Sequence, residues 1–362
     1  MTDSRLSRQQ VEETLARTGE EPIPLFDEYI CQATGGSSGH RGVFVLDAEA
    51  MADFVCSLLR TATAGTGRGG GDAGGCLTIG LVAAASAVHA TGIAPKLMDG
   101  SPFRFVSVPA TLPVAEVVER LNALQPNALF GYASMLARLA SERREGRLRI
   151  TPALLRSTSE TLLPEHRAAI TTAFGVPLVD TFASSEGLTG HSDPGEAVVT
   201  FASDLCIVEL VDDRNRPVPP GEPSARVLVT NLYNRVQPLI RYVLEDTFVR
   251  QPDDAGHGHL RATVEGRADE ILHYEDADIH PLVIRSVMVK TPEIADYQVR
   301  QTASGIDVAV IAHARVDRQH LGERLRGALT AAGLERPTVG VRTVPALERR
   351  PGTGKLRRFV PL

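Results

Sequence analysis

The sequence predicts an α/β fold with two domains: a large N-terminal α/β domain of layered sheets and helices, and a small α+β C-terminal domain. Three observations support this prediction. Short β-branched runs alternate with helical patterns through most of the first 265 residues, the pattern turns to β from residue 198, and a separate set of strands and one helix begins near residue 266. Because 362 residues favour two domains over one, we expect domains at 1–265 and 266–362.

The elements of the first domain follow one another in a regular order. Strands are predicted at GVFVLD, FRFVSVP, NALFGY and LLRSTSE, and helices at AEAMADFVCSLLR, VAEVVERLNALQ and ASMLARLASERREG. A strand followed by a helix is predicted within CLTIGLVAAASAVHA. The intervening TATAGTGRGGGDAGG has too little side-chain mass to pack, so it is predicted as a surface loop or disordered segment. Its GTGRGG matches the letters of the dinucleotide-binding fingerprint. That fingerprint requires a strand directly before it and a helix directly after it, and neither is predicted here.

Strands are then predicted in VVTFASDLCIVELVD and ARVLVTNLY. The C-terminal domain has strand patterns at YQVRQTA, IDVAVIAHARV and TVGVRTV, and a helix pattern at RQHLGERLRGALTAAG. At the other end of the chain, Ser7 with Gln10 predicts a capping box that opens a short helix. No internal repeat is evident.

Composition excludes several classes of protein. The chain is 43% hydrophobic, its net charge is −6, and it has no basic stripe interleaved with aromatics, so we expect a globular protein with a small ligand and no nucleic acid. Four cysteines without a CxxC pair argue against zinc and against a disulfide framework. The polar N-terminus has no signal-peptide core and no run reaches the ~20 apolar residues of a membrane span. We therefore expect a cytoplasmic protein that does not associate with a membrane.

The segment ATGGSSGHRG, residues 33–42, combines backbone freedom with hydroxyl groups. Glycines let the backbone approach a ligand, and serine and threonine hydroxyls can donate to phosphate oxygens. The residues concerned are Thr34, Gly35, Gly36, Ser37, Ser38 and Gly39. By itself the segment also fits an ordinary turn.

Four further segments follow it in order: DTFASSEG (180–187), PLIRYVLED (238–246), GRADEIL (266–272) and PGTGKLRR (351–358). With these five motifs in this order, the chain resembles the adenylate-forming superfamily, which includes acyl-CoA synthetases, peptide-synthetase adenylation domains and luciferases. The similarity in motif order spans roughly residues 30 to 360, and the chain most closely resembles the phenylacetate–CoA ligase branch. The resemblance implies a mobile C-terminal lid, and an N-terminal domain trimmed at its start.

The resemblance implies an ATP site. The loop at 34–39 would hold the β- and γ-phosphates, Ser185 would contact the α-phosphate, and Asp246 would accept both ribose hydroxyls. The remaining cofactor-binding positions carried over are Ser159, Glu160 and Thr161 along the adenine, Phe182 in place of the family's tyrosine, and Asp180 in the same motif. A carboxylate can accept from a diol at both oxygens, which suits Asp246.

The resemblance also implies the catalytic groups. Lys355 would bridge the substrate carboxylate and the nucleotide, Glu186 would bind Mg²⁺, Arg267 would contact ribose or phosphate, and Asp269 would be the hinge. Joining a carboxylate to ATP brings two anions together, so a cation and a metal at the site are chemically required. Taken singly, each of these residues also fits a solvated surface charge. His89, His191, His273 and His280 are not needed as bases, because a carboxylate is already ionised near pH 7.

The implied function is ATP-dependent formation of an acyl-adenylate from a small aromatic acid, with release of pyrophosphate. The acyl group would pass to coenzyme A, a carrier-protein thiol, or an amine or hydroxyl. The glycine-free, acidic HYEDADIHP (273–281) somewhat favours an amine or hydroxyl, since it would repel an anionic acceptor. The sequence leaves open whether the protein forms a homodimer. The alternative function is that of a non-catalytic nucleotide-binding subunit of a larger assembly.

Overall fold

The computed structural model describes residues 1–33, 42–65, 76–84, 87–97, 103–244, 246–252, 258–267, 270–279, 281–288, 290–291, 293–350 and 354–362. The chain divides into two compact units, Met1–Glu265 with Pro351–Lys355, and Gly266–Arg350 with Leu356–Leu362. The loop that contains Lys355 therefore groups with the first unit. That the second unit is an independent, mobile domain stays a prediction.

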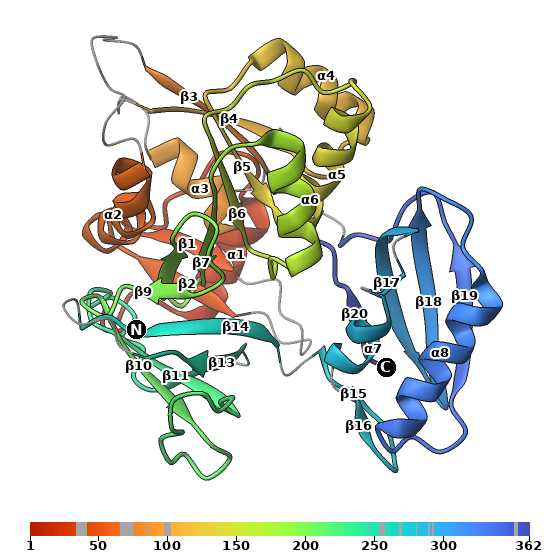
Figure 1. Cartoon of the computed structure of the whole chain (residues 1–362). Coiled ribbons are helices and arrows are strands. Elements are labelled where there is room, and N and C mark those ends of the chain that lie inside the picture. The colour runs from red at the N-terminus through yellow and green to blue at the C-terminus, as the bar shows by residue number, and fades with distance from the viewer. Residues whose placement is uncertain are drawn as a thin grey trace. The chain divides into compact units, whose positions relative to one another are not determined.

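A mixed β-sheet forms the centre of the first unit (Figure 1). In the described chain its strand order is β13-β14-β9-β8-β7-β6-β5-β3-β4. The bounds are β3 (Leu77–Ala83), β4 (Phe103–Pro109), β5 (Ala128–Tyr132), β6 (Leu154–Thr158), β7 (Leu178–Ala183), β8 (Thr189–Ser192), β9 (Val199–Phe201), β13 (Asp246–Arg250) and β14 (Arg261–Arg267). Strands β4, β3, β5, β6 and β7 are parallel, whereas β8, β9 and β14 continue the sheet antiparallel.

Helices cover both faces of this sheet (Figure 1). One face carries α4 (Val114–Leu124), α5 (Ala133–Arg144) and α6 (Pro164–Phe174), and the other carries α2 (Ala48–Gly65) and α3 (Ala90–Leu97). The parallel strands place Leu129, Leu155 and Leu178 in the core at no more than 1% exposure, because helices cover both faces of a parallel sheet. Helix α6 begins with proline and ends at Gly175 in the left-handed conformation, as its sequence suggests.

Smaller elements complete the first unit. Helix α1 (Arg8–Arg17) has the capping box of Ser7 and Gln10, which confirms that prediction. Strands β1 (Ile30–Ala33) and β2 (Val43–Leu46) form an antiparallel pair on either side of the predicted phosphate loop. Strands β10 (Cys206–Val211), β11 (Arg226–Asn231) and β12 (Tyr242–Leu244) form a three-stranded antiparallel sheet.

The second unit is an α+β arrangement around its own core. Its sheet has the order β19-β18-β17-β20, with β17 (Ile294–Thr302), β18 (Gly305–Ala312), β19 (Thr338–Thr343) and β20 (Phe359–Val360). Helices α7 (Pro281–Met288) and α8 (Arg318–Ala331) accompany it, with the short pair β15 (Leu272–His273) and β16 (Asp278–Ile279). Apolar side chains of α8, such as Leu325, share a buried cluster with Val299 and Val308 of the sheet.

Two local predictions were wrong. The segment after Arg60 was predicted as loop, but α2 continues through Gly65, because extending an existing helix adds one hydrogen bond for each residue fixed. A strand and a helix were predicted within CLTIGLVAAASAVHA, residues 76–90, but the helix begins only at Ala90, the last residue of that segment. The GTGRGG letters beyond Gly65 lie outside the described residues.

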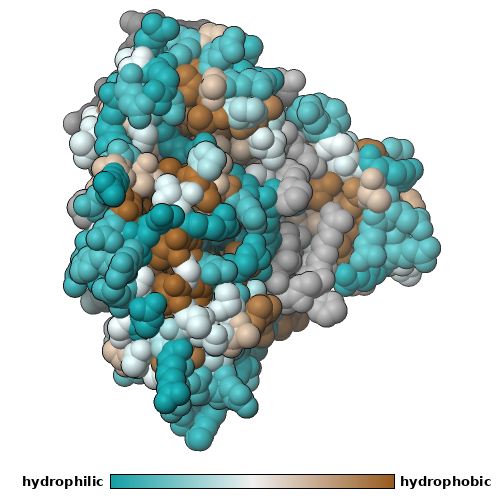
Figure 2. All heavy atoms as spheres, turned by 90° about the vertical axis from the view of Figure 1, so that its right-hand side faces the viewer, coloured by the Kyte–Doolittle hydropathy of each residue, from teal (hydrophilic) through white to brown (hydrophobic). Residues whose placement is uncertain are grey.

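On the face seen in Figure 2, hydrophobic residues are interspersed with hydrophilic ones. None of the helices in the described ranges combines the length and apolar character that crossing a bilayer needs.

Candidate functional site

The carboxyl ends of β5, β6 and β7 bring together residues that are far apart in the sequence. Ser159, Glu160 and Thr161 directly follow β6, while Ser185 and Glu186 follow β7 in the turn to β8. Carboxyl ends of adjacent parallel strands lie at one edge of a sheet, and in open α/β sheets ligands bind there. The structure therefore places these two predicted groups at the same edge.

The backbone after β6 is held in an unusual conformation. Ser159 has a φ of 65°, in the left-handed region that is costly for a residue with a side chain. The Glu160 Oε2 atom accepts a hydrogen bond of 3.0 Å from the backbone N–H of Ser134, in the first turn of α5. This contact fixes the loop against α5, where a carboxylate suits the positive end of the helix.

The turn after β7 is fixed by side chains from the end of β11. Gly187 has a φ of 100°, and its carbonyl accepts from the hydroxyl of Tyr233 at 3.1 Å. Asn231 donates from Nδ2 to the carbonyl of Glu186 at 3.1 Å. A Cβ atom on Gly187 would lie 2.1 Å from that same Nδ2 atom. The backbone that presents Ser185 and Glu186 is therefore held by side-chain hydrogen bonds from Asn231 and Tyr233.

Two hydroxyl groups near this turn were missed by the sequence reasoning. Ser184 Oγ and Thr181 Oγ1 are buried, and neither has a hydrogen-bond partner in the part of the chain that the structure describes. Leaving a buried hydroxyl unpaired is costly, so such a group points to a ligand or water. The only signal in the sequence was their place in DTFASSEG, beside Ser185.

Asp180 and Phe182 lie on the face of the sheet opposite Thr181, because side chains alternate along a strand. Ser157 donates to Asp180 Oδ1 at 2.6 Å, and burial raises the pKa of this carboxyl above its usual value. The Phe182 ring packs edge-on against Phe201 and Phe248, with centroids 5.5 and 5.3 Å away. The structure thus gives both residues packing roles, and their predicted contacts with a nucleotide stay predictions.

Lys355 lies at the end of β5. Its Nζ atom is 5.7 Å from the ring centroid of Tyr132, the last residue of that strand. The Tyr132 hydroxyl accepts from the backbone N–H of Ala84 at 2.9 Å, so the ring is fixed at both ends. Gly354 has a φ of 69°, and a Cβ there would approach the carbonyl carbon of Ala110 to 2.9 Å. Tyr132 is a third residue that the sequence reasoning missed, since the sequence shows it only as the aromatic end of a predicted strand.

Other predicted residues are not brought to this edge by the strand order. Asp246 opens β13, four strands from β7 in the sheet order, and is half-buried. Arg267 ends β14, and its side chain lies outside the described residues. Asp269 and the loop of Thr34, Gly35, Gly36, Ser37, Ser38 and Gly39 also lie outside them.

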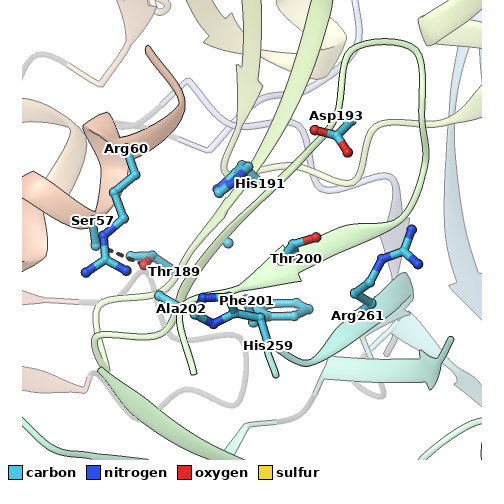
Figure 3. A pocket seen from close by; sticks show the side chains of 11 residues that line it. Ser57, Arg60, Thr189, His191, Asp193, Thr200, Phe201, Ala202, His259 and Arg261 are labelled. Carbon is cyan, nitrogen blue, oxygen red and sulfur yellow. Dashed lines mark hydrogen bonds between the residues drawn. The ribbon is translucent and has the colours of Figure 1, made fainter. Parts of the chain in front are cut away.

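A pocket of about 320 Å³ lies on the face of the sheet that α2 covers (Figure 3). It is lined by Ser57, Arg60, Thr189, Gly190, His191, Asp193, Thr200, Phe201, Ala202, His259 and Arg261. Thr189 donates to the Ser57 hydroxyl at 2.9 Å, which joins β8 to α2. Burial, and then the nearby Arg156 guanidinium, lower the pKa of His191 below its usual value.

The chain was compared with known proteins. No family model matches it. It is 26% identical to the protein CapK of Staphylococcus aureus over 134 residues, which are 36% of this chain and 28% of that protein. It is 24% identical to the phenylacetate-coenzyme A ligase of Aromatoleum evansii over 133 residues, which are 36% of this chain and 30% of that enzyme. Each match therefore spans less than a third of the relative's length.

A solved structure covers far more of the chain. The crystal structure of a 2-hydroxyisobutyryl-CoA ligase, in the postadenylation state in complex with R3-HIB-AMP, matches with a TM-score of 0.70 at 18% identity. The match covers 98% of this chain and 79% of that one. At this identity the match shows the fold: the chain has the fold of an acyl-CoA ligase, and the two partial sequence matches agree with it.

Proposed function

We propose that the protein joins a carboxylic acid to ATP, forming an acyl-adenylate and releasing pyrophosphate. The observation that best supports this proposal is the position of Lys355, which lies over Tyr132 at the strand-end edge where the Ser185 and Glu186 turn also lies. A lysine of an exposed tail is usually solvated. A lysine over an aromatic ring at such an edge can neutralise an anion there.

The reaction needs charge neutralisation rather than a base. An oxygen of the ionised acid attacks the α-phosphorus, and the bond from that phosphorus to the bridging oxygen of pyrophosphate breaks. Lys355 would offset the charge of the two approaching anions. The hydroxyls of Ser184 and Ser185 would donate to phosphate oxygens, which would satisfy the unpaired Ser184 Oγ.

The residues present fit magnesium held jointly with a nucleotide. In the described residues, no group of three or more His, Cys, Asp and Glu side chains could hold a metal alone. Glu186 supplies one hard oxygen ligand from a fixed turn, and Mg²⁺ commonly takes only one or two carboxylates plus phosphates and waters. When bound, the ion would supply positive charge to the phosphates.

For the substrate we infer a small aromatic acid, a choice supported by the partial match to a phenylacetate-coenzyme A ligase. In a second step, a thiol, amine or hydroxyl would attack the acyl carbon, lose its proton and displace AMP. Coenzyme A is one candidate acceptor, supported by the ligases that the chain resembles. Asp269 is proposed as the hinge between the steps, with the 34–39 loop and Arg267 on the nucleotide.

Carboxylate-dependent exchange of labelled pyrophosphate into ATP tests the first step. We expect exchange with at least one acid from a panel of benzoates, arylacetates and short fatty acids, and at least about a 100-fold loss in Lys355→Ala, as when a key electrostatic group is removed. Lys290→Ala, which removes an exposed lysine elsewhere, is the matched control and should be unaffected. Tight ATP binding without any exchange would instead support a non-catalytic nucleotide-binding subunit.

A further inference from the structure

The pocket beneath α2 lies on the same face of the sheet as Tyr132. Residues paired across neighbouring strands point to the same face. The registers pair Tyr132 with Thr158, Thr158 with Thr181, and Thr181 with His191. The row continues from His191 through Thr200 to Arg261, and all three line the pocket. Thr189, another lining residue, follows Gly187 by two positions, so the pocket begins directly after the turn that holds Glu186.

The pocket is large enough for an aromatic ring and polar enough to bind a substituent. A cavity of about 150 Å³ suffices for benzene, and this one has about 320 Å³. Figure 3 shows His191, Thr200 and Arg261 extending from neighbouring strands around it. Most of the lining side chains carry hydroxyl, imidazole, guanidinium or carboxylate groups. A plain hydrocarbon could not pair with those of these groups that have no partner within the protein, which costs binding energy.

His191 is the polar group best placed to bind. Its ring is half-buried, and the described residues offer neither ring nitrogen a hydrogen-bond partner. Because burial lowers its pKa, the ring is neutral near pH 7 and offers one donor and one acceptor. Thr200, its neighbour on β9, likewise has a hydroxyl without a partner in the described chain. A hydroxyl group on a ligand can donate one hydrogen bond and accept another at the same time, so it can pair with His191 and with Thr200.

The charges around the pocket are balanced. Arg60 is paired with Asp204 at 2.7 Å, and Arg261 lies 3.8 Å from Glu196. The buried Arg156 adds a positive charge and the lining Asp193 a negative one. Three guanidinium groups are thus matched by three carboxylates. A second carboxylate on the ligand would lose its hydration without a net positive charge in the pocket to compensate. A neutral polar group costs much less free energy to desolvate.

From this arrangement we infer that the pocket holds the non-reacting end of the acid and selects hydroxylated aryl acids over their unsubstituted parents. His191 and Thr200 are the residues that determine this specificity. The inference rests on the proposed adenylation and names its substrate class.

The experiment uses matched acids that differ by one group. Pyrophosphate exchange is measured with benzoate, 3- and 4-hydroxybenzoate and terephthalate, and with phenylacetate and 4-hydroxyphenylacetate. We expect kcat/KM about 10-fold higher for the best hydroxylated acid than for its parent, the discrimination that one or two hydrogen bonds give. His191→Leu and the isosteric Thr200→Val should erase this preference, because they lower kcat/KM for the hydroxylated acid much more than for its parent. His313→Leu, at an exposed position, is the control.

Equal use of each pair, preference for terephthalate, or an equal loss for both acids in His191→Leu would overturn the inference. Absence of exchange with every acid would refute the proposed adenylation. The inferred preference of the pocket for hydroxylated acids is then tested by acid binding alone. Equilibrium dialysis of 4-hydroxybenzoate and benzoate should still show tighter binding of the hydroxylated acid, lost in His191→Leu. Equal binding by both proteins would overturn it.

Discussion

The ammonium group of Lys355 lies 5.7 Å from the ring centroid of Tyr132, although 222 intervening residues separate the two in the sequence. The ring is immobilised because its hydroxyl accepts from the Ala84 N–H and its side chain is fully buried. A fixed aromatic face attracts a cation by roughly 0.5–2 kcal/mol. Tyr132 therefore acts as a positioning residue for Lys355 if Lys355 is the adenylating lysine.

Substituting Tyr132 separates positioning from stability. Tyr132→Phe keeps the ring but leaves the Ala84 N–H unpaired, so we expect a lower melting temperature and nearly unchanged pyrophosphate exchange. Tyr132→Leu removes the ring, and kcat for exchange should fall about 2- to 30-fold. AMP release from a supplied acyl-adenylate, which does not need Lys355 in this scheme, should be preserved. Equal damage to both half-reactions in Tyr132→Leu would show that the ring serves stability alone.

Gly187 should tolerate no side chain. In Gly187→Ala the new Cβ would meet Asn231 Nδ2 at 2.1 Å and the Tyr233 hydroxyl at 2.5 Å, and Asn231 is held by the backbone N–H groups of Tyr233 and Asn234. We expect a loss of at least about 2–3 kcal/mol in the free energy of unfolding, measured by urea denaturation. Gly175→Ala, with a φ of 68° and open space around it, is the control and should cost about 1 kcal/mol. Similar losses at both positions would contradict the steric explanation.

Ser184→Ala should weaken ATP binding without lowering the stability of the fold. Because Ser184 Oγ is buried without a partner among the described residues, removing it should leave the melting temperature unchanged or raise it. If the hydroxyl donates to a phosphate oxygen, KM for ATP should rise about 3- to 10-fold. Ser286→Ala, in an exposed position on α7, is the comparison. An unchanged KM would leave Ser184 outside the nucleotide site.

Asp180 predicts a dependence of stability on pH. Burial raises the pKa of its carboxyl from the usual 3.8, so the folded state binds a proton more tightly than the unfolded state. Stability from this group is therefore full below about pH 3.8 and is lost as the pH rises through the raised pKa. Asp180→Asn keeps an acceptor for Ser157 and removes the charge.

The stability of Asp180→Asn relative to the unsubstituted protein should grow as the pH rises from 3.8 and then level off. Denaturant unfolding at a series of pH values measures this difference. Asp213→Asn, at an exposed carboxylate, provides the baseline. A difference that stays constant with pH would mean that the buried carboxyl is not the titrating group.

The sequence by itself determined the order of elements and the class of fold. Runs such as NALFGY and VAEVVERLNALQ have the period of a strand or a helix, and this local signal survives in β5 and α4. Five motifs in one order predicted the ligase fold that the matching solved structure shares. The local signal failed after Arg60, where α2 extended through residues whose composition resembles a loop.

The tertiary structure decided which side chains share a face, because that depends on strand register and on packing between distant segments. Asp180 and Phe182 belong to the same motif as Ser185, yet alternation along β7 turns them away from Thr181. Tyr132 and His191 lie outside the five motifs, and Ser184 lies within DTFASSEG beside the predicted Ser185. Their significance arises only where β5, β6, β7 and β8 lie side by side in the sheet and where the chain returns at Lys355. A residue becomes part of a site through neighbours that are distant in the sequence.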